Sequence, residues 1–230
     1  YTTDYAGTIR YGNASSTSTG TAPDIGAWEL DGTVAVAMSY TSSTTVQLTG
    51  NAYVNQNNQA IIRVKIVTTG AINALTVSKL ILNANGTTDI ANINATTAKV
   101  YYTTNTTFST ATLFGSTTPT ISDFEVSGTQ ALVEGDNYFW LTYDIIAGAT
   151  QNNLIDGECI DLTVGTAQTP TVSAPSGNKS ILGAMSGTYA VGASQTENGS
   201  AFTKLTTAIA DLNLRGVSGA VIFALQSDYS

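Results

Sequence analysis

The chain has 230 residues, of which only 10% are charged, and its 16 acidic and 8 basic residues give a net charge of −8. Nucleic-acid binding depends on Lys and Arg contacts to phosphates, so this composition argues against a nucleic-acid partner. Histidine is absent, which removes the side chain most used for proton transfer near neutral pH, and a single cysteine excludes an internal disulfide. No apolar run reaches the roughly 18 residues that a membrane span requires.

The polar residues are mostly Thr, Ser and Asn, and glycine is frequent. This usage is typical of extracellular β-proteins. The sequence begins and stops within recognisable patterns, and we therefore expect it to be a piece of a larger protein.

The first thirty residues carry one short motif. Asp24–Glu29, with the sequence DIGAWE, resembles the D-x-G-A-[YW]-E signature that closes right-handed parallel β-helices in bacterial surface proteins. The resemblance implies that residues 1–30 form a terminal rung of a β-helix, where polar or aromatic residues shield the open sheet end. Residues 31–45 read as a linker.

Strand signals recur from residue 46 to residue 166 at a spacing typical of β-sandwiches. The apolar phase shifts between Val77 and Leu80, which predicts a β-bulge. No sustained helical period occurs in this region, and we expect an all-β fold with an antiparallel sandwich of jelly-roll or immunoglobulin-like type. The predicted strands lie at 60–66, 75–82, 98–102, 124–126, 137–145 and 160–164.

The stretch Asn137–Ile145 has the clearest pattern in the chain. Its odd-numbered side chains, from Phe139 to Ile145, are apolar, whereas the even-numbered ones from Tyr138 to Asp144 are aromatic or polar. Alternation with period two predicts a strand with one face in the core.

A family resemblance rests on this strand and on motifs in one order around it. It includes Gly86–Ile90, Lys99–Tyr102, Asn137–Ile145 and the Asp156-x-Glu158-Cys159 segment. Together they look like the β-sandwich domain that precedes the catalytic propeller in bacterial BNR-repeat neuraminidases. That domain also occurs tiled in very large bacterial surface proteins, so the resemblance implies a sandwich fold and a bacterial extracellular or cell-surface location.

Neuraminidase chemistry requires an arginine cluster, and the propeller carries Ser-x-Asp-x-Gly-x-x-Trp boxes. Here the three arginines are dispersed at Arg10, Arg63 and Arg215, and no such box occurs. We expect that this chain is not an enzyme.

Residues 167–185 contain Pro170 and Pro175 among Thr, Ser and Gly, which predicts a second linker. In 186–230, the apolar spacing of Phe202, Leu205, Ile209 and Leu212 predicts one short amphipathic helix. Asn198 or Ser200 would cap its start and Gly216 would end it, followed by a strand at 221–225. The order resembles the capping helix and first strand of a following β-helix.

Two groups of residues are candidate sites. Asp156, Glu158 and Asp161 are the densest acidic cluster, and their oxygens would suit Ca²⁺, the one cofactor that we consider. Tyr101, Tyr138 and Trp140 lie on the outward phase of their strands, where they would be sugar platforms or would be covered by other parts of the chain. Cys159 is expected to be a buried structural thiol, since no histidine exists to activate it.

Two functions follow from these expectations. The first is a structural tile of a large extracellular adhesin or filament, whose partners are neighbouring copies or domains of the same protein. The alternative is a carbohydrate-binding accessory module of a secreted glycosidase or sialidase, whose partners are surface glycans.

Overall fold

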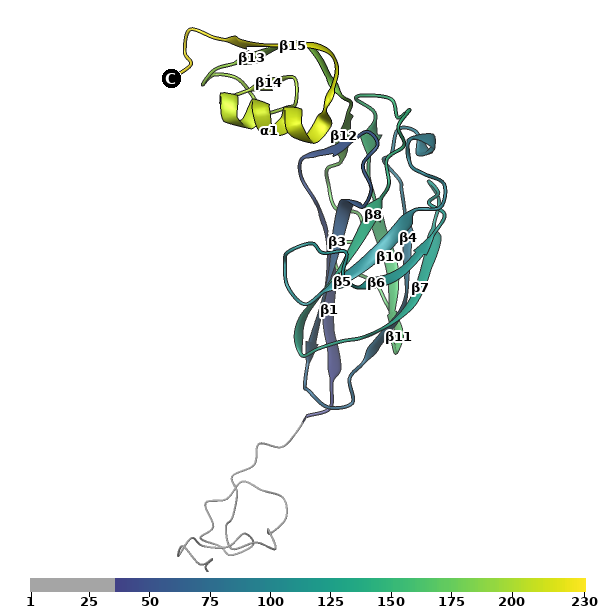
Figure 1. Ribbon diagram of the computed structural model, residues 1–230. Coiled ribbons are helices and arrows are strands. Elements are labelled where there is room, and N and C mark those ends of the chain that lie inside the picture. Colours follow the sequence, from purple (N-terminus) through teal and green to yellow (C-terminus); the bar gives the residue numbers. More distant parts are fainter. Residues whose placement is uncertain (1–35) are drawn as a thin grey trace, which may run out of the picture.

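The computed structural model describes residues 36–230, which form mostly β-strands in several antiparallel sheets together with one short α-helix (Figure 1). The expectation of an all-β chain with a single short helix near its C-terminal end is therefore confirmed. Within residues 36–230, no helix has the length and apolar character needed to cross a membrane.

The largest sheet has five antiparallel strands with β8 at its centre. Every residue of β8 from Asn137 to Tyr143 is buried, because neighbouring strands cover its two edges and other parts of the chain cover both faces. This confirms the strand that the alternating pattern predicts. In spatial order the sheet contains β1 (Ser39–Gln47), β3 (Gln59–Thr69), β8 (Gly135–Tyr143), β5 (Ala98–Thr103) and β6 (Leu113–Thr117).

The second antiparallel sheet has four strands. The pairing of β4 with β7 shifts between Val77 and Lys79, which confirms the predicted bulge. In spatial order the sheet contains β11 (Thr166–Gln168), β10 (Glu158–Val164), β4 (Thr76–Asn83) and β7 (Phe124–Ala131).

Side chains from the two sheets share one hydrophobic cluster. The Phe139 ring, fully buried, lies at 5.3 Å from the Phe114 ring and at 5.2 Å from the Tyr102 ring. Cys159 is also fully buried in this cluster, as expected for a structural thiol. At the sheet edges, β6 and β7 approach so closely that a Cβ on Gly115 or Gly128 would collide with the backbone of the other strand.

A small third sheet changes the expected boundaries. It joins β2 (Asn51–Tyr53), β12 (Lys179–Leu182) and β9 (Leu154–Ile155). The predicted linkers at 31–45 and 167–185 are wrong where β1 and β12 lie within them. The proline-containing loop before β12 is hydrogen-bonded to both main sheets. The Thr171 amide donates to the Ser43 carbonyl of β1, and the Cys159 amide of β10 donates to the Ser173 carbonyl. A 3₁₀ turn, η1 (Ile90–Asn92), lies in the connection between β4 and β5.

The C-terminal unit has its own hydrophobic cluster. Its three strands are parallel in the order β14 (Ala201–Phe202), β13 (Met185–Val191) and β15 (Val217–Leu225), and the helix α1 (Leu205–Arg215) packs against them. Parallel pairing requires such a crossover connection, which α1 supplies between β13 and β15.

The helix ends as expected and begins differently. Gly216, at φ 68°, donates its amide to the Leu212 carbonyl and stops the helix. The expected caps at Asn198 or Ser200 are wrong, since the N-cap is Lys204 and the Asn198 side chain accepts hydrogen bonds from the loop instead. Ile209 is 43% exposed, because Ala208 takes the position against the sheet.

Candidate functional site

The outward face of the five-stranded sheet brings the aromatic candidates together. Strand register places Tyr101 of β5 opposite Trp140 of β8, and Arg63 of β3 on the other side of Trp140. The Arg63 guanidinium lies 5.2 Å from the Tyr138 ring centre and 5.4 Å from the Trp140 ring centre. The Trp140 indole N–H donates to the Thr103 hydroxyl at 2.9 Å, which fixes the orientation of the ring.

These aromatic rings do not form an open platform. Tyr101, Tyr138 and Trp140 are 7%, 6% and 3% exposed. The loop between β5 and β6 carries Phe108 over them, with ring centres 5.9 Å from Tyr101 and 5.6 Å from Trp140. The outward phase of the strands is therefore covered by the chain itself, and the prediction of a sugar platform at these residues is wrong.

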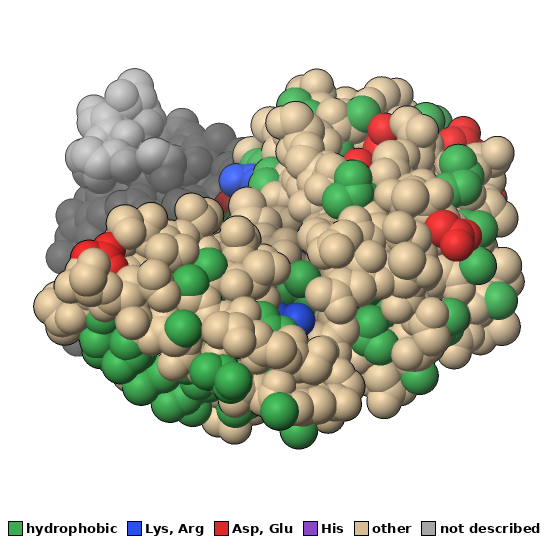
Figure 2. All heavy atoms as spheres, turned by 90° about the horizontal axis from the view of Figure 1, so that it is seen from above, with side chains coloured by type: hydrophobic (Ala, Val, Ile, Leu, Met, Phe, Trp, Pro, Cys, Tyr) green, Lys and Arg blue, Asp and Glu red, His purple; other side chains and the backbone are tan. Residues whose placement is uncertain are grey.

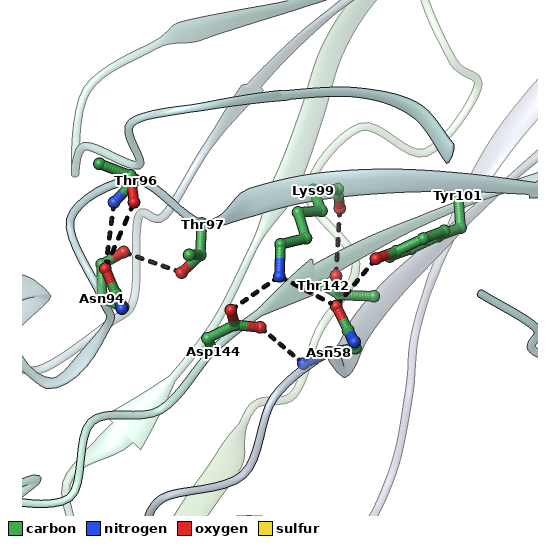
Figure 3. A network of polar contacts seen from close by, with 8 residues as sticks. All are labelled: Asn58, Asn94, Thr96, Thr97, Lys99, Tyr101, Thr142 and Asp144. Atoms are coloured by element: carbon green, nitrogen blue, oxygen red, sulfur yellow. Dashed lines mark hydrogen bonds and ion pairs between the residues drawn. The ribbon is translucent and has the colours of Figure 1, made fainter. Parts of the chain in front are cut away.

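A polar network lies beside this aromatic cluster (Figure 3). Lys99 Nζ lies 2.7 Å from Asp144 Oδ2 and donates to Asn58 Oδ1 at 3.2 Å. The Tyr101 hydroxyl donates to the same Asn58 oxygen at 2.9 Å, and the Asn58 backbone amide donates to Asp144 Oδ1 at 2.7 Å. The Thr142 hydroxyl donates to the Lys99 carbonyl. The Asp144 carboxylate thus binds both the Lys99 amine and the backbone of the turn that carries Asn58.

The elements explain why these groups meet. Lys99 lies on β5, Asp144 directly follows β8, and Asn58 precedes β3, the other neighbour of β8. Asn58 has φ 54°, a left-handed conformation that asparagine tolerates better than most residues. The Lys99 and Asp144 side chains are 24% and 9% exposed, so their charge-assisted bond is shielded from solvent better than a surface ion pair.

The structure does not gather the three acidic candidates into a metal site. Among the described residues, no three or more His, Cys, Asp or Glu side chains are grouped to hold a metal ion. The Asp156 carboxylate accepts from the Gly157 backbone amide, and the Glu158 carboxylate accepts from the Asn85 side-chain amide. The prediction of a Ca²⁺ site at these residues is therefore wrong.

In the folded chain, the charged form of the Asp156 carboxylate is less favourable than in the unfolded chain. Burial, and secondarily the nearby Glu158, raise its pKa from 3.8 to about 6, although the Gly157 amide opposes the shift. A pKa raised by folding means that the folded state binds the proton more tightly, so stability decreases as pH rises between about 4 and about 6.

We therefore expect Asp156→Asn to be more stable than the parent chain by about 1 kcal/mol at pH 7, after allowance for solvent screening, and to show no gain near pH 4. Urea unfolding across this pH range measures both quantities. Asp161→Asn, five residues further along the chain on β10, is the matched control and should leave the pH dependence of the parent intact. A gain that is as large at pH 4 as at pH 7 would contradict the assignment to Asp156.

A cleft of about 300 Å³ lies where β2 meets α1, lined by Tyr53, Phe202 and Asp211 among others. Its carboxylates are already used within the chain. Glu197 accepts hydrogen bonds from the Thr203 amide and the Thr207 hydroxyl, and Asp211 pairs with Arg215 at 2.9 Å. We interpret this cleft as part of the joint between the C-terminal unit and the rest of the chain.

The comparisons with known proteins leave the family open. No protein-family model matches the chain, and no curated protein matches it significantly.

Sequence reasoning missed the polar network and the covering loop. Asn58 and Asp144 are 86 residues apart, and no local pattern connects them. The one usable signal is that Lys99 and Asp144 both occupy the outward phase of their strands, as opposite charges that cross-strand pairing would favour. Phe108 lies in a Thr- and Ser-rich segment without any period, so its position over the sheet carries no sequence signal.

Proposed function

We propose that this chain is a structural module of a large bacterial surface protein, an adhesin or filament, that spaces its neighbouring modules and joins them through strand pairing. In this interpretation, the two antiparallel sheets with their common core are the sandwich that the resemblance implies. The parallel C-terminal sheet with its covering helix is the start of a β-helix. The module itself carries out no catalysis.

The observation that supports this proposal most directly is the edge formed by β15. Among the described residues, β15 pairs only with β13, so its second edge has no strand beside it. Val217, Ile222 and Leu225 are 61%, 58% and 53% exposed, and Figure 2 shows hydrophobic side chains gathered on one side of the C-terminal unit. Parallel sheets are normally covered, and an open apolar edge of this length favours addition of another strand.

The proposal is tested by sedimentation velocity of the 230-residue chain over a range of concentrations. We expect association that increases with concentration and that Ile222→Lys suppresses, because a charge at this edge opposes strand addition. Val133→Lys, a substitution at another exposed apolar side chain, is the matched control and should leave the association unchanged. A chain that remains monomeric throughout, or association equally strong in Ile222→Lys, would count against joining through β15.

The carbohydrate-binding alternative loses its main support. It depends on Tyr101, Tyr138 and Trp140 as sugar platforms, and these rings are buried beneath Phe108 and Arg63. A broad glycan panel that includes sialosides is expected to give no saturable binding to this chain. Binding that disappears in Trp140→Ala would restore the alternative.

A further inference from the structure

Three reactive groups meet in the polar network of Figure 3: a primary amine, a side-chain amide and a carboxylate. Lys99 Nζ lies 3.2 Å from Asn58 Oδ1 and 2.7 Å from Asp144 Oδ2. The amine is therefore next to the amide carbonyl and also next to a base that can take its proton. We propose that Lys99 and Asn58 form an intramolecular isopeptide bond and that Asp144 carries the protons of this reaction.

The reaction balances without any further reactant. Asp144 takes a proton from the Lys99 ammonium, and the nitrogen lone pair then attacks Cγ of Asn58, so that the carbonyl electrons move onto Oδ1. The bond between Cγ and Nδ2 breaks as Asp144 returns its proton to Nδ2 and the attacking nitrogen gives up another. One C–N bond forms, one C–N bond breaks, and the nitrogen of Asn58 leaves as ammonium while Asp144 is again a carboxylate.

The surroundings favour this reaction in two ways. The Tyr101 hydroxyl donates to Asn58 Oδ1 at 2.9 Å, the atom on which negative charge develops during attack. The residue that carries the reacting side-chain amide is also held in place, because the backbone N–H of Asn58 donates to Asp144 Oδ1 at 2.7 Å. The three groups are thus positioned before reaction by two strands and one turn, which removes much of the entropic cost of bringing amine and amide together.

Lys99 and Asp144 are less exposed than the other lysine–carboxylate pairs of the described residues. The Asp144 side chain is 9% exposed and the Lys99 side chain 24% exposed. The 2.7 Å contact between Lys99 Nζ and Asp144 Oδ2 lies within the distance over which a positioned base takes a proton directly. By contrast, Lys65 with Asp136 and Lys79 with Glu125 are ion pairs with more exposed side chains.

The bond would connect residues 41 positions apart, from Asn58 directly before β3 to Lys99 on β5. These two strands lie on opposite sides of β8, so the link would span the central strand of the five-stranded sheet. This proposal is independent of joining through β15, and either can fail without the other.

Intact-protein mass spectrometry of the purified 230-residue chain tests the proposal. The expected result is a mass below the calculated value by one ammonia, about 17 Da, and a protease digest in which the Asn58 and Lys99 peptides are joined. Lys99→Arg, Asn58→Ala and Asp144→Asn should each restore the calculated mass. Lys79→Arg is the matched control, because Lys79 is also a strand lysine in an ion pair. This variant should still show the loss of one ammonia.

The same mass loss can arise when an asparagine cyclises to a succinimide, and the variants separate these sources. A succinimide would persist in Lys99→Arg and would give no joined peptides. Parent chain at its full calculated mass after prolonged incubation, or a loss retained in Lys99→Arg, overturns the proposal. The digest of the parent chain decides the matter even if a variant fails to fold.

Discussion

Phe139→Ala is expected to lower the free energy of unfolding by about 3–5 kcal/mol, the range measured for large-to-small changes at fully buried aromatic residues. Phe139 is 0% exposed, lies on the central strand β8 and contacts the rings of Phe114 and Tyr102. Its removal would leave a cavity between the two sheets, because neighbouring strands hold β8 in register on both sides. Urea unfolding followed by the fluorescence of the neighbouring Trp140 measures the change.

The matched control for this substitution is Leu113→Ala, since Leu113 lies in the same sheet and is 53% exposed. It should change the unfolding free energy by less than about 0.5 kcal/mol. If Phe139→Ala costs as little as the control, the shared core between the two sheets is wrongly described.

Arg215→Ala is the second substitution with a large expected effect. The Arg215 side chain is 1% exposed, donates to the carbonyls of Gly183 and Gly199 at 2.6 Å each, and pairs with Asp211. Removing one partner of a buried ion pair leaves the other uncompensated and typically costs about 3–5 kcal/mol. Because Gly183 connects β12 to β13, we expect the C-terminal unit to loosen selectively.

Hydrogen exchange measures this selectivity directly. Amides of β13 and β15 should lose protection in Arg215→Ala, while those of β3 and β8 keep it. Lys204→Ala, at an exposed residue adjoining the same helix, is the control and should leave both sets protected. Equal loss of protection in all four strands would mean that the C-terminal unit and the sheets unfold together.

The sequence predicts the strands whose side chains alternate and misses those whose do not. Asn137–Ile145 alternates because one face of β8 must enter the core, so both the strand and its faces can be read directly. The sequence predicts a linker over most of β1, because the inward residues of this strand are Ser43 and Thr45, which are 1% and 2% exposed. Polar side chains at core positions remove the hydrophobic period on which the prediction depends.

The candidate site shows the same limit. Alternation predicts that Tyr101, Tyr138 and Trp140 share the outward face of the sheet. It does not predict that these rings are buried, because Phe108 and Arg63 cover them from other segments of the chain. Spacing in the sequence likewise suggests that Asp156, Glu158 and Asp161 meet at a metal ion, whereas the described residues contain no such group of three. Long-range contacts of this kind depend on tertiary packing that local pattern does not encode.

The arrangement of the two ends of residues 36–230 has a consequence for how this part of the chain responds to pulling. The described part of the chain enters at one end of the long axis through β1 and leaves at the opposite end through the C-terminal unit (Figure 1). Because β1 runs along β3 with antiparallel hydrogen bonds from Ser39 to Gln47, tension applied to the ends would load these bonds together in shear rather than one at a time. Hydrogen bonds that are loaded together in this way resist extension better than those of a terminal strand that peels away from its sheet one bond at a time.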